Sequence, residues 1–185
     1  MYIDETLYTG RPAEKRIDKE ERCYELLDRL GVEYLRVDHD FANTIEDCQK
    51  VEKLLGCTIC KNLLLTNRQQ TDVYLLAMPG EKPFKTKILS KQIGSARLSF
   101  ASAEQMEQYL DITPGSVSVL GLMNDREKKV RLLMDEELLK EEYFACHPCI
   151  NSSSIKFKTS DLMEKILPAT EHGVTTVQLP WNVEE

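Results

Sequence analysis

The stretch ICKNLLLTN, residues 59–67, decides the fold, because it is an apolar strand that carries an amine and an amide, Lys61 and Asn62, near its beginning. An ammonium group that enters a buried strand loses hydration, which is costly unless an anion, a ligand or a water-filled cleft receives it. Two interpretations follow. Lys61 lines a cavity, or strand alternation turns it to solvent at a sheet edge, where lysines hinder aggregation.

The composition around this strand describes a single folded domain. The 185 residues carry a formal net charge of −7, with 30% charged and 42% hydrophobic residues. This balance is typical of a globular protein and disfavours a general DNA or RNA binder. There is no apolar run of membrane-spanning length and no secretory signal at the start, so we expect a cytoplasmic protein that does not associate with membranes.

Hydrophobic periodicity and capping residues predict interleaved helices and strands. Residues 1–17 are interpreted as a polar lead-in, and residues 18–185 as one domain. Helices are expected over residues 18–30, 44–55, 86–93, 102–110, 135–143 and 160–167, with Asp18, Thr44, Ser102 and Ser160 as N-caps. Strands are expected over residues 32–37, 59–67, 72–78, 98–101, 117–123, 130–134, 144–150, 154–158 and 175–179, with hairpins joining the second to the third and the fifth to the sixth. The pattern predicts an α+β domain with a mixed, antiparallel-rich sheet flanked by helices.

One stretch of the acidic chain is basic. Five basic residues and no acidic residue lie between positions 82 and 97, namely Lys82, Lys85, Lys87, Lys91 and Arg97. Such a run is compatible with an ordinary solvated helix face or with a patch that binds phosphate groups.

Two Cys-x-x-Cys pairs, Cys57/Cys60 and Cys146/Cys149, offer four thiols that together match the ligand set of one structural zinc. The long separation of the pairs and their position in apolar strands favour packing instead. Neither pair opens a helix after a strand, which disfavours a thioredoxin-like site. We therefore expect reduced thiols and no bound metal.

The three histidines differ in their surroundings. His39 lies in an acidic loop and His172 lies beside a glycine, so both are expected to be exposed. His147 stands between two cysteines in an apolar segment, where it is either a satisfied core residue or a functional group.

Four blocks of the sequence together resemble one known family. These blocks are KNLLL (61–65), GSARLSFAS (94–102), PGSVS (114–118) and HP (147–148). In this order they resemble the YbaK/prolyl-tRNA-editing family, over roughly Asp18 to Leu167, and most of all its free-standing members that hydrolyse alanine mischarged onto proline tRNA. The resemblance implies a barrel-like sheet flanked by helices and a site without metal or cofactor.

The resemblance also implies roles for individual residues. Lys61 would orient the terminal adenosine phosphate or the ester, with support from Asn62, and His147 would lie near the ester. Gly115, Ser116 and Ser118 would bind substrate through a turn that offers backbone N–H groups to the developing oxyanion. Two departures concern the shape of the pocket. Val119 stands where the family has proline, and His39-Asp40-Phe41 replaces a His-Pro-Pro loop.

Three hypotheses of function follow. The first is a trans-editing deacylase for Ala-tRNA(Pro), which docks the acceptor end of the tRNA on the basic stretch and has prolyl-tRNA synthetase as a candidate partner. The second is a non-catalytic relative that binds proline, its tRNA or the synthetase and regulates proline metabolism. The third is an interaction module stabilised by zinc.

Overall fold

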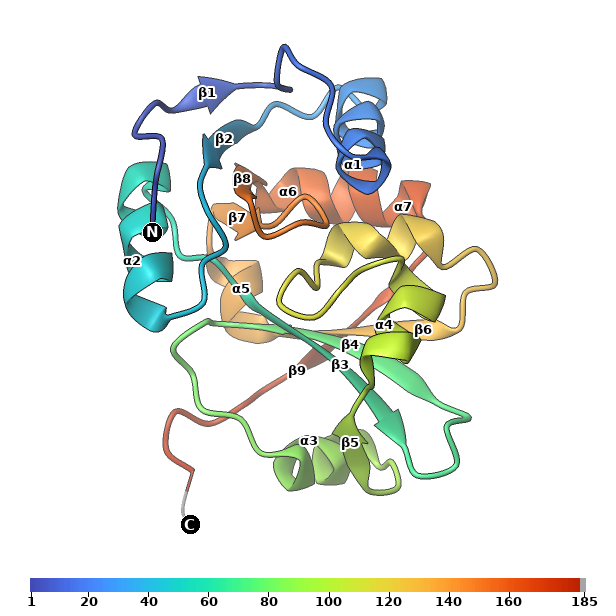
Figure 1. Cartoon of the computed structure of the whole chain (residues 1–185). Helices are drawn as coiled ribbons and strands as arrows, with labels where there is room; N and C mark the ends of the chain where they lie inside the picture. Colours follow the sequence, from blue (N-terminus) through green and yellow to red (C-terminus); the bar gives the residue numbers. More distant parts are fainter. Residues whose placement is uncertain (184–185) are drawn as a thin grey trace.

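The computed structural model describes residues 1–183, and Figure 1 shows its elements along the chain. The strands are β1 (Tyr8–Thr9), β2 (Leu35–Asp38), β3 (Lys61–Asn67), β4 (Val73–Met78), β5 (Leu98–Phe100), β6 (Val130–Asp135), β7 (Tyr143–Cys146), β8 (Ser153–Lys158) and β9 (Val174–Val177). The α-helices are α1 (Asp18–Arg29), α2 (Ile45–Leu55), α3 (Thr86–Ile93), α4 (Ala103–Leu110), α5 (Glu136–Lys140), α6 (Thr159–Asp161) and α7 (Leu167–Ala169). A 3₁₀ helix, η1, spans Val119–Asn124, and a π-helical segment, η2, spans Leu162–Ile166. None of the helices in residues 1–183 has the length and apolar character needed to cross a membrane.

The strands form two sheets, seen above and below one another in Figure 1. The four-stranded sheet has the order β1-β2-β8-β7, and all its pairs are antiparallel. The five-stranded sheet has the order β5-β3-β4-β6-β9, with antiparallel pairs on one side of β4 and parallel pairs on the other. The sheets meet where Ile59, just before β3, bridges to Ala145 of β7. The predicted α+β class is confirmed, and the strands form two joined sheets without closing a barrel.

The helix boundaries follow the capping residues at two of the predicted positions. Thr44 accepts a hydrogen bond from the backbone N–H of Asp47 at the start of α2. Ser102 and Gln105 form a reciprocal capping box at the start of α4. Asp18 and Ser160 do not act as N-caps, because they lie inside α1 and α6, whose N-cap residues are Ile17 and Lys158.

Alternation along β3 divides the buried side chains between two hydrophobic layers. Leu64 belongs to a large cluster to which both sheets contribute, and Leu65 faces the opposite layer, where α3 packs through Leu89. A third, smaller cluster packs Val51 and Leu55 of α2 against the four-stranded sheet. Burying one such side chain contributes roughly 1.5–3 kcal/mol, so the two faces of β3 tie α3 and both sheets together.

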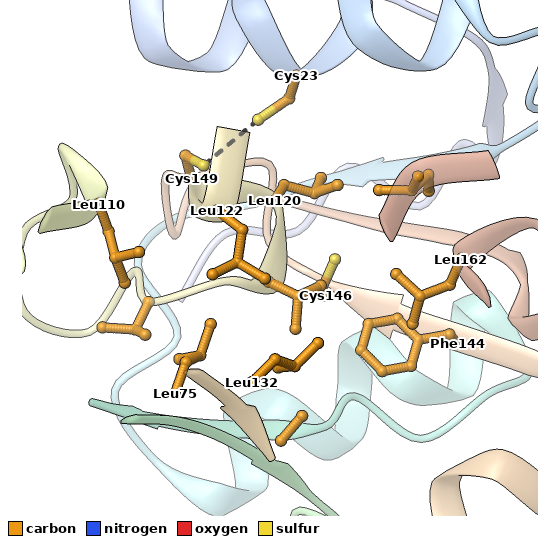
Figure 2. Packing of buried hydrophobic residues seen from close by; sticks show 14 of the residues in the cluster. Cys23, Leu75, Leu110, Leu120, Leu122, Leu132, Phe144, Cys146, Cys149 and Leu162 are labelled. Atoms are coloured by element: carbon orange, nitrogen blue, oxygen red, sulfur yellow. Dashed lines mark hydrogen bonds between the residues drawn. The ribbon is translucent and has the colours of Figure 1, made fainter. Parts of the chain in front are cut away.

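Figure 2 shows the large cluster at the level of side chains. Leu75 of β4 and Leu132 of β6 lie below Leu120 and Leu122 of η1, and Phe144 of β7 closes the side of the cluster. All five side chains are at most 2% exposed. This packing holds η1 between the two sheets.

The structure corrects the predicted hairpin over residues 117–134. Residues 119–124 form η1 and not a strand, because the Ser118 hydroxyl accepts a hydrogen bond from Leu120 N at 3.2 Å and turns the chain. Gly121 lies so close to the residues after α4 that a Cβ there would be 2.6 Å from Cδ1 of Ile112. β6 therefore pairs with β4 in parallel, across a long connection that contains α3 and α4.

The N-terminal residues pair with the four-stranded sheet. β1 is antiparallel to β2, and Ile3 forms an isolated bridge with His39. Asp40 donates its backbone N–H to the carbonyl of Tyr2 at 2.9 Å. The predicted lead-in thus covers the segment between β2 and α2, which carries His39. β9 corresponds to the strand predicted over residues 175–179 and lies at the edge of the five-stranded sheet.

Candidate active site

The junction of the two sheets brings the two main predicted site residues together. Cys60 donates its backbone N–H to the Ala145 carbonyl at 3.1 Å, which aligns the start of β3 with the end of β7. Lys61 and His147, one and two residues further on, consequently line the same cavity of about 280 Å³. The remaining lining residues are Ala42, Asn43, Thr44, Ile45, Cys48, Gln49, Glu52, Ile59, Cys60, Gly80 and Glu81.

Lys61 reaches this cavity with an ammonium group that the protein satisfies only in part. Its Nζ donates to the backbone carbonyl oxygen of Lys82 at 2.8 Å, and burial lowers its pKa below the ordinary value. Within residues 1–183, Lys61 forms no salt bridge. An ammonium has three N–H donors, so donors remain for a group that enters the cavity. Of the two interpretations of Lys61, the structure supports the cavity.

The N-terminus of α2 forms a second positive element of the same wall. Asn43, Thr44 and Ile45 surround the first turn of this 11-residue helix and line the cavity. Unpaired N–H groups and the helix dipole make such an end favourable for anions. Lys61 and the N-terminus of α2 are the positive elements of the cavity wall, and Glu52 and Glu81 are acidic residues in the same lining.

His147 is half-buried, and its imidazole is neutral. Nδ1 lies 2.9 Å from the Ser153 carbonyl oxygen, and burial lowers the pKa of His147 to about 4. The bond to a backbone carbonyl assigns the proton to Nδ1, since a carbonyl only accepts. The other nitrogen, Nε2, therefore carries the lone pair and can accept a hydrogen bond.

The structure corrects the expectation that His39 and His172 are exposed, because they are only 6% and 8% exposed. His172 contacts the Asp125 carboxylate at 2.9 Å, far along the chain from the cavity residues. His39 lies beside the candidate site, with its ring centroid 6.1 Å from that of His147. An acidic loop in the sequence gave no signal of this burial, which arises because the N-terminal residues cover the loop.

Four residues predicted to bind substrate lie outside the cavity lining. Asn62 follows Lys61 on the opposite face of β3 and donates to the Cys60 sulfur at 3.2 Å. Ser116 and Ser118 are fully buried, and their hydroxyl groups accept backbone N–H bonds from Asn151 and Leu120. Direct contact of these residues with substrate stays a prediction.

The turn at Gly115 nevertheless supports one wall of the cavity. Gly115 has a φ of +85°, which favours glycine, and the turn is tied to Asn151 through Ser116. Asn151 in turn holds both backbone groups of Ala42, donating to its carbonyl at 3.1 Å and accepting from its N–H at 3.3 Å. Asn151 is a supporting residue of the cavity wall that sequence reasoning missed, because its partner Ala42 lies 109 residues away.

The predicted basic patch loses one of its members. Lys82 is 2% exposed, and its Nζ contacts the Asp135 carboxylate at 2.7 Å, so the prediction that Lys82 faces tRNA is wrong. The buried pair fixes the loop whose carbonyl receives Lys61. The other four residues, Lys85, Lys87, Lys91 and Arg97, are exposed on or beside α3.

Three of the four cysteines in the two Cys-x-x-Cys pairs are packed in the core near the site. Cys60, Cys146 and Cys149 are buried, and burial raises the pKa of the Cys60 thiol to about 12. Cys149 lies 3.4 Å from the sulfur of Cys23 on α1, as the dashed line in Figure 2 marks. Among the described residues, no group of three or more His, Cys, Asp or Glu side chains is arranged to hold a metal ion.

Comparison with known proteins identifies the family. The sequence profile of the aminoacyl-tRNA editing domain matches residues 39–165, which is well over half of the chain and includes Lys61 and His147. The chain therefore belongs to the aminoacyl-tRNA editing domain family. The expected enzyme class, a hydrolase that deacylates aminoacyl-tRNA, is confirmed.

Particular relatives narrow this likeness. The chain is 32% identical over 163 residues to the prolyl-tRNA editing protein ProX of Acetoanaerobium sticklandii, covering 88% of this chain and 99% of that protein. It is 27% identical over 165 residues to prolyl-tRNA synthetase associated domain-containing protein 1 of Danio rerio, covering 88% and 89%. A solved structure whose title proposes a trans-editing enzyme for prolyl tRNA synthetase has a TM-score of 0.65 at 14% identity, covering 90% and 100%. The last likeness concerns the fold alone, and the resemblance to prolyl-tRNA editing proteins is confirmed.

Proposed function

We propose that this protein is a trans-editing deacylase that hydrolyses tRNA(Pro) mischarged with alanine and so protects translation fidelity. The similarity to the prolyl-tRNA editing protein of A. sticklandii along almost the whole length of that protein supports tRNA(Pro) as the substrate. The enzyme would act on aminoacyl-tRNA that prolyl-tRNA synthetase has released. Its partners are therefore the acceptor end of tRNA(Pro) and, in the cell, prolyl-tRNA synthetase.

The Lys61 ammonium group is the observation that carries this proposal. A half-buried cation with a lowered pKa, a single backbone carbonyl partner and an adjacent cavity is a site prepared for an electron-rich ligand. The phosphate or the ester of an aminoacylated terminal adenosine supplies such a group. The N-terminus of α2 adds to the same attraction.

The reaction is hydrolysis of a carboxylic ester. A water oxygen attacks the ester carbonyl carbon with the help of the neighbouring ribose hydroxyl, the bond from carbon to the 3′ oxygen breaks, and that oxygen leaves with a proton. Lys61 orients the ester or the adjacent phosphate, and the neutral Nε2 of His147 accepts a hydrogen bond from the water or the ribose. We assign Asn62 and the Gly115 turn to holding this geometry.

The preference for alanine follows from size. The cavity of about 280 Å³ has to hold both the aminoacyl group and part of the terminal nucleotide, so the volume left for the amino-acid side chain is small. A pocket that admits alanine and excludes proline acts as the second sieve that a synthetase needs when two amino acids differ by a few atoms.

The exposed residues Lys85, Lys87, Lys91 and Arg97 are proposed to dock the acceptor stem. The loop from Lys82 to Lys85 connects α3 directly to the carbonyl that holds Lys61, so a stem bound along α3 has its end near the cavity. Basic side chains in this position contact phosphates without reading sequence.

Hydrolysis of a panel of proline tRNAs tests the proposal. Ala-tRNA(Pro) should be deacylated, and correctly charged Pro-tRNA(Pro) and Ala-tRNA(Ala) should persist. Hydrolysis of Pro-tRNA(Pro) at the same rate would overturn the size argument. If every ester persists while tRNA(Pro) or the synthetase still binds, the protein is the non-catalytic regulator and the proposed activity is wrong.

A further inference from the structure

A chain of hydrogen bonds leads from His147 away from the cavity to His39. Nδ1 of His147 lies 2.9 Å from the Ser153 carbonyl and 3.3 Å from the Ser154 hydroxyl oxygen. The same hydroxyl lies 2.8 Å from Nε2 of His39, and Nδ1 of His39 lies 2.6 Å from the Asp40 carbonyl. His39 is 6% exposed and Ser154 is fully buried.

The carbonyl at each end of the chain determines where the protons lie. A carbonyl oxygen only accepts, so Nδ1 of His39 carries its proton, and Nε2 of His39 is left as an acceptor. The Ser154 hydroxyl then donates to His39, and its oxygen lone pairs turn toward the N–H of His147. One tautomer of each ring satisfies all of these contacts, with both imidazoles neutral.

The sheet keeps this arrangement in register. β2 and β8 are antiparallel, and the pairs Asp38–Ser153 and Val37–Ser154 place the acceptors for His147 directly beside the end of β2. The Asp38 carboxylate accepts from the Ser153 hydroxyl at 2.7 Å. His39 donates its backbone N–H to the Ser152 carbonyl at 3.0 Å, which fixes its ring opposite Ser154.

We propose that His39 and Ser154 are positioning residues that hold the His147 ring with Nδ1 protonated and the Nε2 lone pair toward the cavity beside Lys61. The inference rests on the deacylase function proposed above. Without the Ser154 contact, only the Ser153 carbonyl holds Nδ1, so a fraction of the rings can rotate or take the Nε2-protonated tautomer, which presents a donor where the reaction needs an acceptor. Histidines with catalytic or metal-binding roles are commonly fixed through the second ring nitrogen in this way.

The groups around His39 affect its pKa in opposite directions. Burial lowers the pKa of His39, while Asp38, Asp40 and the Asp40 carbonyl act in the opposite direction. A proton on His39 would reverse its bond with Ser154 and place a positive charge near His147. That charge would act in the same direction as burial, which is the main cause that lowers the pKa of His147, whereas the Ser153 carbonyl acts in the opposite direction.

Nitrogen-15 NMR of the histidine rings tests the tautomer directly and independently of activity. In the wild-type protein at pH 7, His147 should show one protonated nitrogen, Nδ1. In Ser154→Ala, a buried change that removes one oxygen atom, a second population protonated at Nε2 should appear. Ser154→Thr, which keeps the hydroxyl, and His39→Gln, which keeps an acceptor, should retain the wild-type spectrum.

Deacylation kinetics test the consequence. Ser154→Ala should lower kcat about tenfold, the order seen when an outer partner of a functional histidine is removed, with the KM for tRNA nearly constant. In a His147→Ala background the same change should cause no additional loss, whereas a role in fold stability would lower kcat in both backgrounds. His172→Gln is the matched control, because it alters an equally buried histidine outside the cavity and should leave kcat unchanged.

The outcomes separate the two proposals. An unchanged His147 spectrum in Ser154→Ala, or an equal loss of kcat with and without His147, would overturn the positioning role. A shifted tautomer in a protein whose wild type hydrolyses none of the esters would support the positioning role and refute the deacylase function.

Discussion

Replacing Lys61 with methionine removes the charge from the cavity and keeps a side chain of similar length. Lys61 shares its face of β3 with Leu63 and Leu65, so a methionine continues the apolar surface there. The variant loses one hydrogen bond, the 2.8 Å contact with the Lys82 carbonyl, and with it the burial cost of an ammonium group. We expect deacylation to be lost while the fold is kept.

The size of both effects follows from general magnitudes for charged and hydrogen-bonded groups. Two unit charges 4 Å apart attract by about 4 kcal/mol at the effective dielectric constant near a protein surface, and solvent around a half-buried group reduces this to about 3 kcal/mol. At 1.4 kcal/mol for each factor of ten, kcat/KM should fall about 100-fold or more. The free energy of unfolding should change by less than about 1 kcal/mol, because the lost hydrogen bond and the relieved desolvation offset each other.

The assay is release of alanine from Ala-tRNA(Pro) under single-turnover conditions, with urea unfolding measured in parallel. Lys165→Met is the matched control, since Lys165 is an exposed lysine outside the cavity. If Lys61→Met hydrolyses the ester at the wild-type rate, the assigned site is wrong. If the variant loses several kcal/mol of stability, Lys61 is a structural residue and the argument from its unsatisfied donors fails.

Four further predictions concern the surface, the core, pH and metal. Reversing Lys85 and Lys87 to glutamate should raise the KM for tRNA and flatten its dependence on salt, with little change in kcat. The reason is that fewer counterions are released on binding when phosphate contacts are lost. Measuring the KM across a salt series checks this. Lys82→Met should lower the free energy of unfolding by about 3–5 kcal/mol in a urea titration, because it leaves the Asp135 carboxylate buried without its partner. Burial lowers the pKa of His147 to about 4 from an ordinary value of 6.5, so between these pH values the unfolded chain binds a proton that the folded chain does not. The free energy of unfolding should therefore fall as the pH drops from 6.5 toward 4. The urea midpoint of His147→Asn should depend less on pH in this range. Chelators should not reduce deacylation, because the paired cysteines are interpreted as packing residues, and activity before and after dialysis against a chelator measures this.

Each of these four predictions has an outcome that would contradict it. An unchanged KM and salt slope in the double reversal, with Lys140→Glu as the control on α5, would assign the α3 surface to solvent. A Lys82→Met variant as stable as wild type would mean that Asp135 is hydrated or protonated. Equal pH slopes in wild type and His147→Asn would remove His147 from the acid response. Loss of activity with release of stoichiometric zinc would restore the zinc hypothesis.

Local patterns along the chain determined much of this fold. The apolar run of β3, the polar turn after it and the second run of β4 predict the hairpin that the structure contains. Thr44 and Ser102 mark the starts of α2 and α4 because a side-chain cap acts within three residues of itself. Lys61 stood out for the same reason, since the cost of a charge in an apolar strand depends on its immediate neighbours.

Tertiary structure alone decided which of these groups meet. The basic spacing that includes Lys82 gave no sign that Asp135, 53 residues later, would bury its ammonium group. His39 became a neighbour of His147 through the pairing of β2 with β8 and through coverage by the N-terminal residues. The segment 119–124 is apolar enough for a strand, and it is a 3₁₀ helix because both sheets pack around it. Hydrophobic and polar patterns indicate whether a residue tends to be buried. They carry no information about which residue it will contact, because those contacts are formed between residues distant in sequence.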